Sequence, residues 1–120
     1  MTIERIEHNG KACAAIRGTE KVITNAQSAL ELLMNVLAET GTKSLVVPKK
    51  LIAEDFFILS RGLAGEVLQK LINYGGRIAV YGDFSHYTSK PLRDFMYESN
   101  KGCDVYFAST EDEAVAAMTR

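Results

Sequence analysis

The feature that most constrains this chain is a regular alternation of short apolar runs with longer amphipathic stretches. Three apolar runs, bounded by glycine or proline, lie at Ser44–Val47, Arg77–Tyr81 and Cys103–Ala108. Runs this short and rich in β-branched and aromatic residues are typical of buried strands. Because a helical pattern separates one run from the next, crossovers must join the strands, and the sheet should be mostly parallel.

The N-terminal segment predicts a β-hairpin. Two strand-like stretches, Ile3–His8 and Lys11–Arg17, flank the dipeptide formed by Asn9 and Gly10. Asn-Gly is the strongest short-range hairpin signal, because both residues tolerate the positive φ angles of a type I′ turn. The first stretch is charged and should lie at a sheet edge, whereas the second is apolar and should be more buried. The charged edge could be blunted against aggregation, or it could pair with another copy of the chain.

Amphipathic patterns and capping signals predict four helices. They are expected at about Asn25–Thr40, Glu54–Tyr74 and Lys90–Ser99, and after the capping-box pattern Thr110–Glu113. In the longest one, Gly62 and Gly65 should each cost roughly 1 kcal/mol relative to alanine. Close packing of that helix on the sheet would explain why the two glycines are there. The predicted fold is therefore a single α/β domain, residues 1–120, with a mixed five-stranded sheet, the N-terminal β-hairpin and four helices.

Composition favours a cytoplasmic protein without a global charge field. The chain has 120 residues, of which 47% are hydrophobic, and this is enough to bury a core without disulfide or metal cross-links. Lys and Arg total 14 and Asp and Glu total 15, so the formal charge of -1 should not attract nucleic acid or acidic membranes. No apolar run approaches the roughly 20 residues of a membrane span, and the N-terminus lacks the apolar region of a signal peptide. We expect no nucleic-acid and no membrane partner.

The cysteines and histidines do not indicate a metal or a cofactor. Cys13 and Cys103 lie in separate apolar segments and form no CxxC pair, so we expect two buried, reduced thiols. A disulfide between them stays open. His8, His86 and the acidic residues near them form no recognised set of ligands. No metal site and no cofactor are predicted.

Polar residues gather in the loop that follows the strand Arg77–Tyr81. Successive parallel strands bring their carboxyl ends to the same side of a sheet, which is where open α/β sheets hold ligands. Glu54 and Asp55, which follow the preceding strand, should therefore border this loop. The candidate interaction or ligand surface consists of Glu54, Asp55, Asp83, Ser85, His86, Tyr87 and Ser89.

Turn chemistry alone can also account for these residue types. Asp83 could bond to amides of its own loop, and Ser89 could cap the helix that follows. Ser85 and His86 are adjacent, and adjacent residues rarely aim their side chains together, so they do not indicate a nucleophile with its base. We assign no catalytic residue, although an enzyme with Asp83 or His86 as a base stays an alternative.

The same loop contains two aromatic residues with different expected positions. Phe84 has no polar side-chain atom and gains roughly 1.5–3 kcal/mol when it is fully buried. His86 and Tyr87 carry polar atoms that lose free energy on desolvation. We therefore expect Phe84 to return to the core, and His86 and Tyr87 to face solvent or a partner.

Several segments are similar to those of a known family. They are Glu54–Phe57, Leu63–Lys70, Gly82–Lys90 and Asp94–Tyr97. Together they resemble an uncharacterised bacterial family, the domain-of-unknown-function family 4180. The resemblance extends from about Val22 to Met118, and the family name implies no activity.

The order of the predicted elements also resembles the STAS fold of anti-sigma factor antagonists and sulfate-transporter tails. Those antagonists carry an acidic residue and then a phosphorylatable serine at the start of their second long helix. Glu54 and Asp55 fall near the acidic position, but Phe56 and Phe57 stand where the serine should be. Ser60 lies one position past that site when it is counted back from the next strand. The resemblance therefore does not carry the serine switch over to this chain.

Two functional hypotheses follow. The first is a non-enzymatic regulatory or protein-interaction module of STAS-like order, whose partner is another cytosolic protein or a second copy of itself. It rests on the compact single domain, on the lack of a specific catalytic constellation and on the element order. The second is a small-molecule binder or enzyme that uses a strand-end pocket around Asp55, Asp83 and His86.

Overall fold

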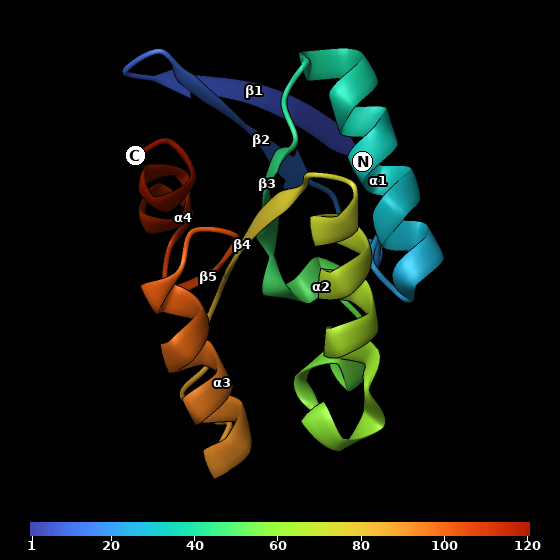
Figure 1. The fold of residues 1–120 in the computed structure, drawn as a ribbon, viewed down its shortest axis with the longest axis vertical. Helices are drawn as coiled ribbons and strands as arrows, with labels where there is room; N and C mark the ends of the chain where they lie inside the picture. Colours follow the sequence, from blue (N-terminus) through green and yellow to red (C-terminus); the bar gives the residue numbers. More distant parts are fainter.

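A five-stranded sheet in the order β1-β2-β3-β4-β5 runs through the molecule, as the computed structural model of residues 1–120 shows (Figure 1). Strand β1 is antiparallel to β2, and the remaining neighbours are parallel, which confirms the predicted mixed sheet. The strands are β1 (Thr2–His8), β2 (Lys11–Arg17), β3 (Ser44–Pro48), β4 (Arg77–Tyr81) and β5 (Val105–Ala108).

The N-terminal hairpin forms as its turn sequence predicts. Asn9 and Gly10 have φ angles of 55° and 77°, as a type I′ turn requires. The strands pair in register from Thr2 opposite Arg17 to His8 opposite Lys11. Strand β1 lies at the sheet edge, while Cys13–Ile16 of β2 are buried.

Four helices cover the two faces of the sheet unequally. They are α1 (Ala26–Thr40), α2 (Leu63–Asn73), α3 (Lys90–Lys101) and α4 (Glu111–Met118). The order from β2 to β5 never reverses, so right-handed crossovers place α1, α2 and α3 on the same face. Helix α4 follows the last strand and packs alone on the other face (Figure 1). The first face has a cluster of 21 buried residues, and the face under α4 has only 8, so the second layer is thin.

The predicted helix Glu54–Tyr74 is wrong in its first half. Three short 3₁₀ turns precede the helix, namely η1 (Lys49–Leu51), η2 (Glu54–Phe57) and η3 (Leu59–Arg61), and α2 begins only at Leu63. Gly62 has φ +79°, a left-handed conformation that interrupts a right-handed helix. The apolar residues of this segment keep a spacing that also fits a helix, and for that reason the pattern was misleading.

The packing explanation for the two glycines is also wrong. A Cβ atom added at Gly62 or at Gly65 would meet nothing within 4 Å. Gly62 is explained by its positive φ, which favours glycine. Gly65 lies within α2 with open space around it, so the structure gives no packing reason for a glycine there.

Smaller corrections concern the C-terminal part of the chain. Helix α3 continues two residues past Ser99, to Lys101, and β5 begins at Val105 rather than Cys103. Both cysteines are free; Cys13 is buried as expected, but Cys103 is exposed because it precedes the strand. No helix has the length and apolar character needed to cross a membrane.

Candidate functional site

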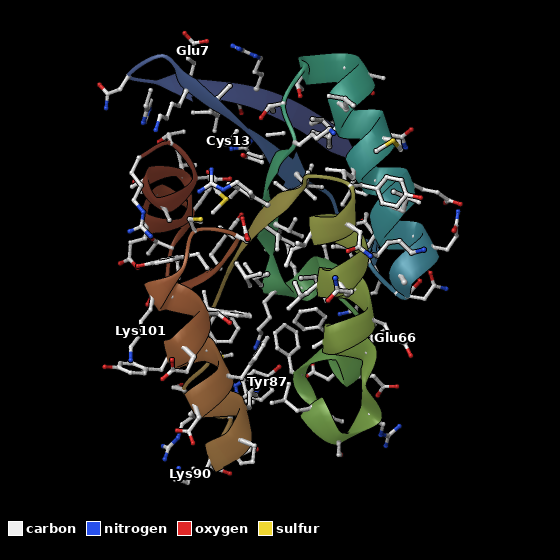
Figure 2. The ribbon with its side chains drawn as sticks, in the orientation of Figure 1. Glu7, Cys13, Glu66, Tyr87, Lys90 and Lys101 are labelled. Atoms are coloured by element: carbon white, nitrogen blue, oxygen red, sulfur yellow. The ribbon has the colours of Figure 1, made fainter.

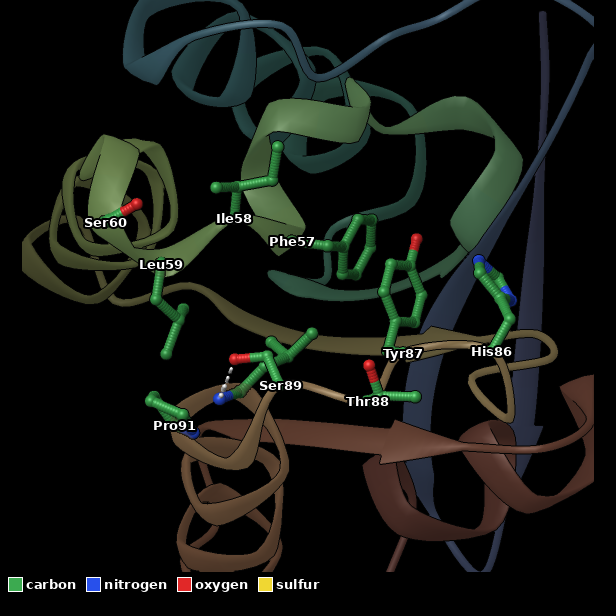
Figure 3. Close-up of a pocket in the computed structure, with 10 residues that line it drawn as sticks. Phe57, Ile58, Leu59, Ser60, His86, Tyr87, Thr88, Ser89 and Pro91 are labelled. Carbon is green, nitrogen blue, oxygen red and sulfur yellow. Dashed lines mark hydrogen bonds between the residues drawn. The ribbon is translucent and has the colours of Figure 1, made fainter.

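A groove of about 640 Å³ opens between two segments that come from different parts of the sequence (Figure 3). One wall is Phe57–Ser60, which includes the link between the turns η2 and η3. The other wall is His86–Ser89 with Pro91 and Leu92, where the loop after β4 enters α3. The groove therefore lies beside the loop at the carboxyl end of β4, the region in which the sequence analysis places its candidate surface.

The first wall combines a buried anchor with exposed apolar and hydroxyl groups. Phe57 is 3% exposed, whereas the next residue, Ile58, is 40% exposed. Leu59 is half-buried and points toward Ser89 and Pro91 of the facing segment (Figure 3). The short 3₁₀ turns make this possible, because they turn one aromatic residue into the core and its neighbour out to the surface.

An aromatic cluster fixes the second wall. The ring of Tyr87 stacks on that of Phe57, with centroids 5.4 Å apart and planes inclined by 27°. Phe84 lies 5.9 Å from Phe57 and, edge-on, 5.9 Å from Phe107 of β5. Offset and edge-to-face contacts of this kind add to the free energy of apolar burial. The loop is therefore held on the same core that carries the first wall.

Tyr87 also binds the first segment through its hydroxyl group, which donates a hydrogen bond to Glu54 Oε1 over 2.5 Å. Burial raises the pKa of Tyr87, and the hydrogen bond and negative charge of Glu54 raise it further. Tyr87 is less open to solvent than expected, since its ring is half-buried and its hydroxyl is bonded to Glu54 within the chain. His86 is exposed as expected, and Phe84 turns inward but is only half-buried.

Lys49 is a structural residue of the site that the sequence analysis missed. Its Nζ donates to the carbonyl oxygen of Asp83 over 2.8 Å and lies 4.8 Å from the centroid of the Tyr87 ring. A cation over an aromatic face is attracted by the ring quadrupole. A Cβ atom at Gly82 would approach Lys49 Cβ to 2.9 Å, so glycine lets the lysine pass. The only sequence signal for this contact was the glycine itself.

Asp83 and Ser89 make local hydrogen bonds, one within the loop and one at the start of α3. The amide of Ser85 donates to Asp83 Oδ1 over 2.9 Å, and hydrogen bonds from Ser85 lower the pKa of the exposed Asp83 carboxyl. The hydroxyl of Ser89 accepts from the amide of Leu92 over 3.4 Å and caps α3. Asp55 lies 3.6 Å from Arg61 on the exposed surface.

The structure thus brings together only part of the predicted surface. Glu54 and Tyr87 are hydrogen-bonded, and the His86 ring lies 4.2 Å from that of Tyr87. Asp55, Asp83 and Ser85 do not line the groove. No group of three or more His, Cys, Asp and Glu side chains is placed to hold a metal ion.

Comparison with known protein families shows to which family the chain belongs. The sequence model described as Domain of unknown function (DUF4180) matches residues 8–118. The chain belongs to this family. Neither a curated protein nor a solved structure matches it. The groove and its supporting contacts all lie within the part of the chain that the DUF4180 model covers.

A second polar cluster in this DUF4180 chain was also missed from the sequence. Arg17 Nη2 donates to both carboxylate oxygens of Glu111 over 3.0 Å, and the hydroxyl of Tyr81 lies 3.4 Å from the same carboxylate. Burial and the negative charge of Glu111 raise the pKa of Tyr81. These residues border a hollow of about 380 Å³. The cluster ties α4 to the carboxyl ends of β2 and β4.

The groove has both apolar and polar walls. Its walls present the aliphatic side chains of Ile58, Leu59 and Pro91. Its polar groups include the hydroxyls of Ser60, Thr88 and Ser89 and the His86 imidazole (Figure 3). An occupant with one apolar and one hydrogen-bonding side would match this surface.

Proposed function

We propose that the protein is a non-enzymatic binding module of the bacterial cytoplasm, and that its groove holds a short segment of another cytosolic protein. The observation that carries the proposal is the exposed Ile58, 40% open to solvent on a wall whose adjacent residue is buried. An apolar side chain that is held in water by a rigid wall gains free energy when a partner covers it.

The rigidity of both walls supports this proposal. The stack of Tyr87 on Phe57 joins the two walls directly. The hydrogen bond from Tyr87 to Glu54 and the contact of Lys49 with Asp83 hold the loop after β4 on the turns next to the first wall. A preformed site loses little conformational entropy when its ligand binds. The partner would place an apolar side chain between Ile58 and Pro91 and a polar group near Thr88.

The STAS-like order of the elements is part of the same proposal. Domains of that order in anti-sigma factor antagonists are regulatory, and a compact chain with a preformed groove suits such a role. The likeness concerns fold order alone, so it supports the class of function and not a particular partner.

The test uses a matched pair of substitutions. Ile58→Glu places a charge in the groove, whereas Ile72→Glu changes an isoleucine of almost equal exposure, 42%, on α2 outside the groove. In affinity capture from the native host, Ile58→Glu should lose the partners that wild type and Ile72→Glu retain. Thermal unfolding of both variants checks that the fold is intact. Partners retained by Ile58→Glu would contradict the proposal.

A small-molecule ligand or substrate in the same groove is the second candidate. The volume of about 640 Å³ falls within the range of roughly 300–1,000 Å³ that is usual for ligand pockets. Of the strand-end residues Asp55, Asp83 and His86, only His86 lines the groove. A metabolite at 100 times its dissociation constant adds roughly 2.7 kcal/mol of stability. A thermal-shift screen should therefore find a ligand whose effect disappears in Ile58→Glu, and a screen without any shift speaks against this candidate.

A further inference from the structure

The two edges of the sheet differ in how their backbone groups are satisfied. At the β5 edge, the side chain of Asn100 accepts a hydrogen bond from the Phe107 amide over 2.7 Å and donates one to the Phe107 carbonyl oxygen over 2.9 Å. One amide side chain thus satisfies the outward-facing backbone groups of Phe107 in the four-residue strand β5. At the other edge, β1 is seven residues long and has a strand only on its β2 side. The longer open edge of the sheet is therefore β1.

The hairpin turn fixes which groups of β1 point outward. In a two-residue hairpin the flanking residues, here His8 and Lys11, form a hydrogen-bonded pair, and hydrogen-bonded pairs then alternate along the ladder. The N–H and C=O groups of Ile3, Arg5 and Glu7 therefore point away from β2. Such a row of free donors and acceptors is a template for strand addition.

We propose that two copies of the chain pair through β1, antiparallel and centred on Ile6, to form one continuous sheet. A two-fold axis perpendicular to the sheet keeps the same face of both copies on the same side. Each odd-numbered residue of β1 therefore lies opposite an odd-numbered residue of the other copy, and each even-numbered residue lies opposite an even-numbered one. Centring on Ile6 places Arg5 opposite the partner's Glu7 on both sides of the axis. It also places Glu4 opposite the partner's His8, and Ile6 opposite its own copy.

Other registers are disfavoured by charge. Centring on Glu4, Arg5 or Glu7 puts that residue directly opposite its own copy, and like charges in directly opposed positions destabilise a sheet. Centring on Ile3 leaves the charged half of the strand without a partner. The register on Ile6 is the one in which complementary charges flank an apolar pair.

The side chains concerned can accept a second partner. Arg5 and Glu7 form an ion pair of 2.8 Å within the strand, and their side chains are 48% and 51% exposed. The guanidinium group has five donors, of which Arg5 uses one for Glu7 and one for the Thr40 carbonyl oxygen. Pairing of two copies would bring two arginines and two glutamates into one alternating cluster. Ile6, half-buried against the core under α4, would extend that core across the axis.

The experiment uses two opposite charge changes and their mixture. Arg5→Glu and Glu7→Arg each place two like-charge pairs across the axis, so each variant alone should dimerise less than wild type in sedimentation equilibrium. In the mixture, the new carboxylate at position 5 of one chain faces the new guanidinium at position 7 of the other. The heterodimer should form with a dissociation constant about tenfold below that of either homodimer, which corresponds to about 1.4 kcal/mol.

Within one chain, each variant has like charges at positions 5 and 7, and this repulsion is the same in the homodimer and in the heterodimer. A stronger heterodimer must therefore come from contacts between the two copies. Arg93→Glu, at an exposed arginine of α3, is the matched control and should dimerise like wild type. A wild type that stays monomeric at all soluble concentrations overturns the proposal. So does a mixture without preferred heterodimers.

The dimer and the groove can be tested apart. Glu7 lies at the hairpin end of the molecule and Tyr87 near the opposite end (Figure 2). Ile58→Glu should therefore leave the dimerisation of the full chain unchanged. Loss of captured partners without loss of dimer, or the reverse, shows which of the two proposals fails.

Discussion

Phe57, Phe84 and His86 lie at three depths around the groove, and their contributions to stability should follow that order. Phe57 is buried, Phe84 is half-buried and His86 is exposed. Phe57→Ala should cost about 3–5 kcal/mol, as truncation of a core phenylalanine does. Phe84→Ala should cost about 2 kcal/mol, because part of its ring is already in water. His86→Ala should change stability by less than about 0.5 kcal/mol. Urea midpoints measure all three, and equal losses for Phe84→Ala and His86→Ala would contradict the packing of the loop.

Tyr87 should make stability depend on alkaline pH. Its pKa is raised in the folded protein, by burial first and then by Glu54, so the folded state holds the phenolic proton more tightly than the unfolded state does. That contribution is complete below the unfolded pKa of about 10. It is lost as the pH rises above that value toward the higher folded pKa.

Tyr87→Phe isolates this effect. At neutral pH the variant should be about 0.5–1.5 kcal/mol less stable, because the hydrogen bond to Glu54 is gone. Above about pH 10 its stability should fall less steeply than that of wild type. Urea unfolding at a series of pH values gives the comparison. Tyr81, whose pKa is also raised, titrates in both proteins and serves as the internal reference. Parallel pH profiles of the two proteins would show that Tyr87 is not the group responsible.

At the scale of the element, the two glycines near the start of α2 have opposite roles. Gly62 has φ +79° and precedes the helix, whereas Gly65 lies within α2. Gly62→Ala should destabilise by about 1–2 kcal/mol, because a Cβ atom is strained in the left-handed region. Gly65→Ala should stabilise by about 0.5–1 kcal/mol, because alanine favours the helix and the space around it is open. Thermal unfolding measures both. A stabilising Gly62→Ala would indicate a helix that continues through this position.

At the scale of the whole molecule, the unequal layers predict that the α4 side opens first. Eight residues are too few for a helix that is stable alone, so α4 depends on its small apolar contact with the sheet. Local openings of this kind are expected where few apolar contacts hold an element. Cys13, 0% exposed beneath this layer, and the exposed Cys103 are natural reporters.

Thiol labelling tests this order of opening. Cys103 should react at once, and Cys13 only when α4 leaves the sheet; burial and the charge of Glu111 also raise the pKa of Cys13. Met118→Ala, in α4, and Leu92→Ala, in α3 on the other face of the sheet, should each cost about 2–5 kcal/mol. For the same loss of stability, Met118→Ala should accelerate the labelling of Cys13 more than Leu92→Ala does. Equal acceleration would mean that Cys13 is exposed only by global unfolding.

Features that depend on interactions between neighbouring residues could be predicted from the sequence. Asn9 and Gly10 specified the hairpin through the φ angles they tolerate, and short apolar runs specified the strands through their burial on both faces. The turn at Asp83 and the cap at Ser89 also follow from local hydrogen bonding. Because these interactions span only a few residues, the local sequence contains nearly all of their energy.

Tertiary structure alone decided the geometry of the site. A glycine can continue a helix or break it, and the structure shows that Gly62 takes a positive φ between the 3₁₀ turn η3 and the helix α2. The contact of Lys49 with Asp83 spans 34 residues, and that of Arg17 with Glu111 spans 94. Such pairs depend on the order of the strands and on the face that each helix covers. Hydrophobic periodicity reports which side of an element is apolar, but not which distant element will lie against it.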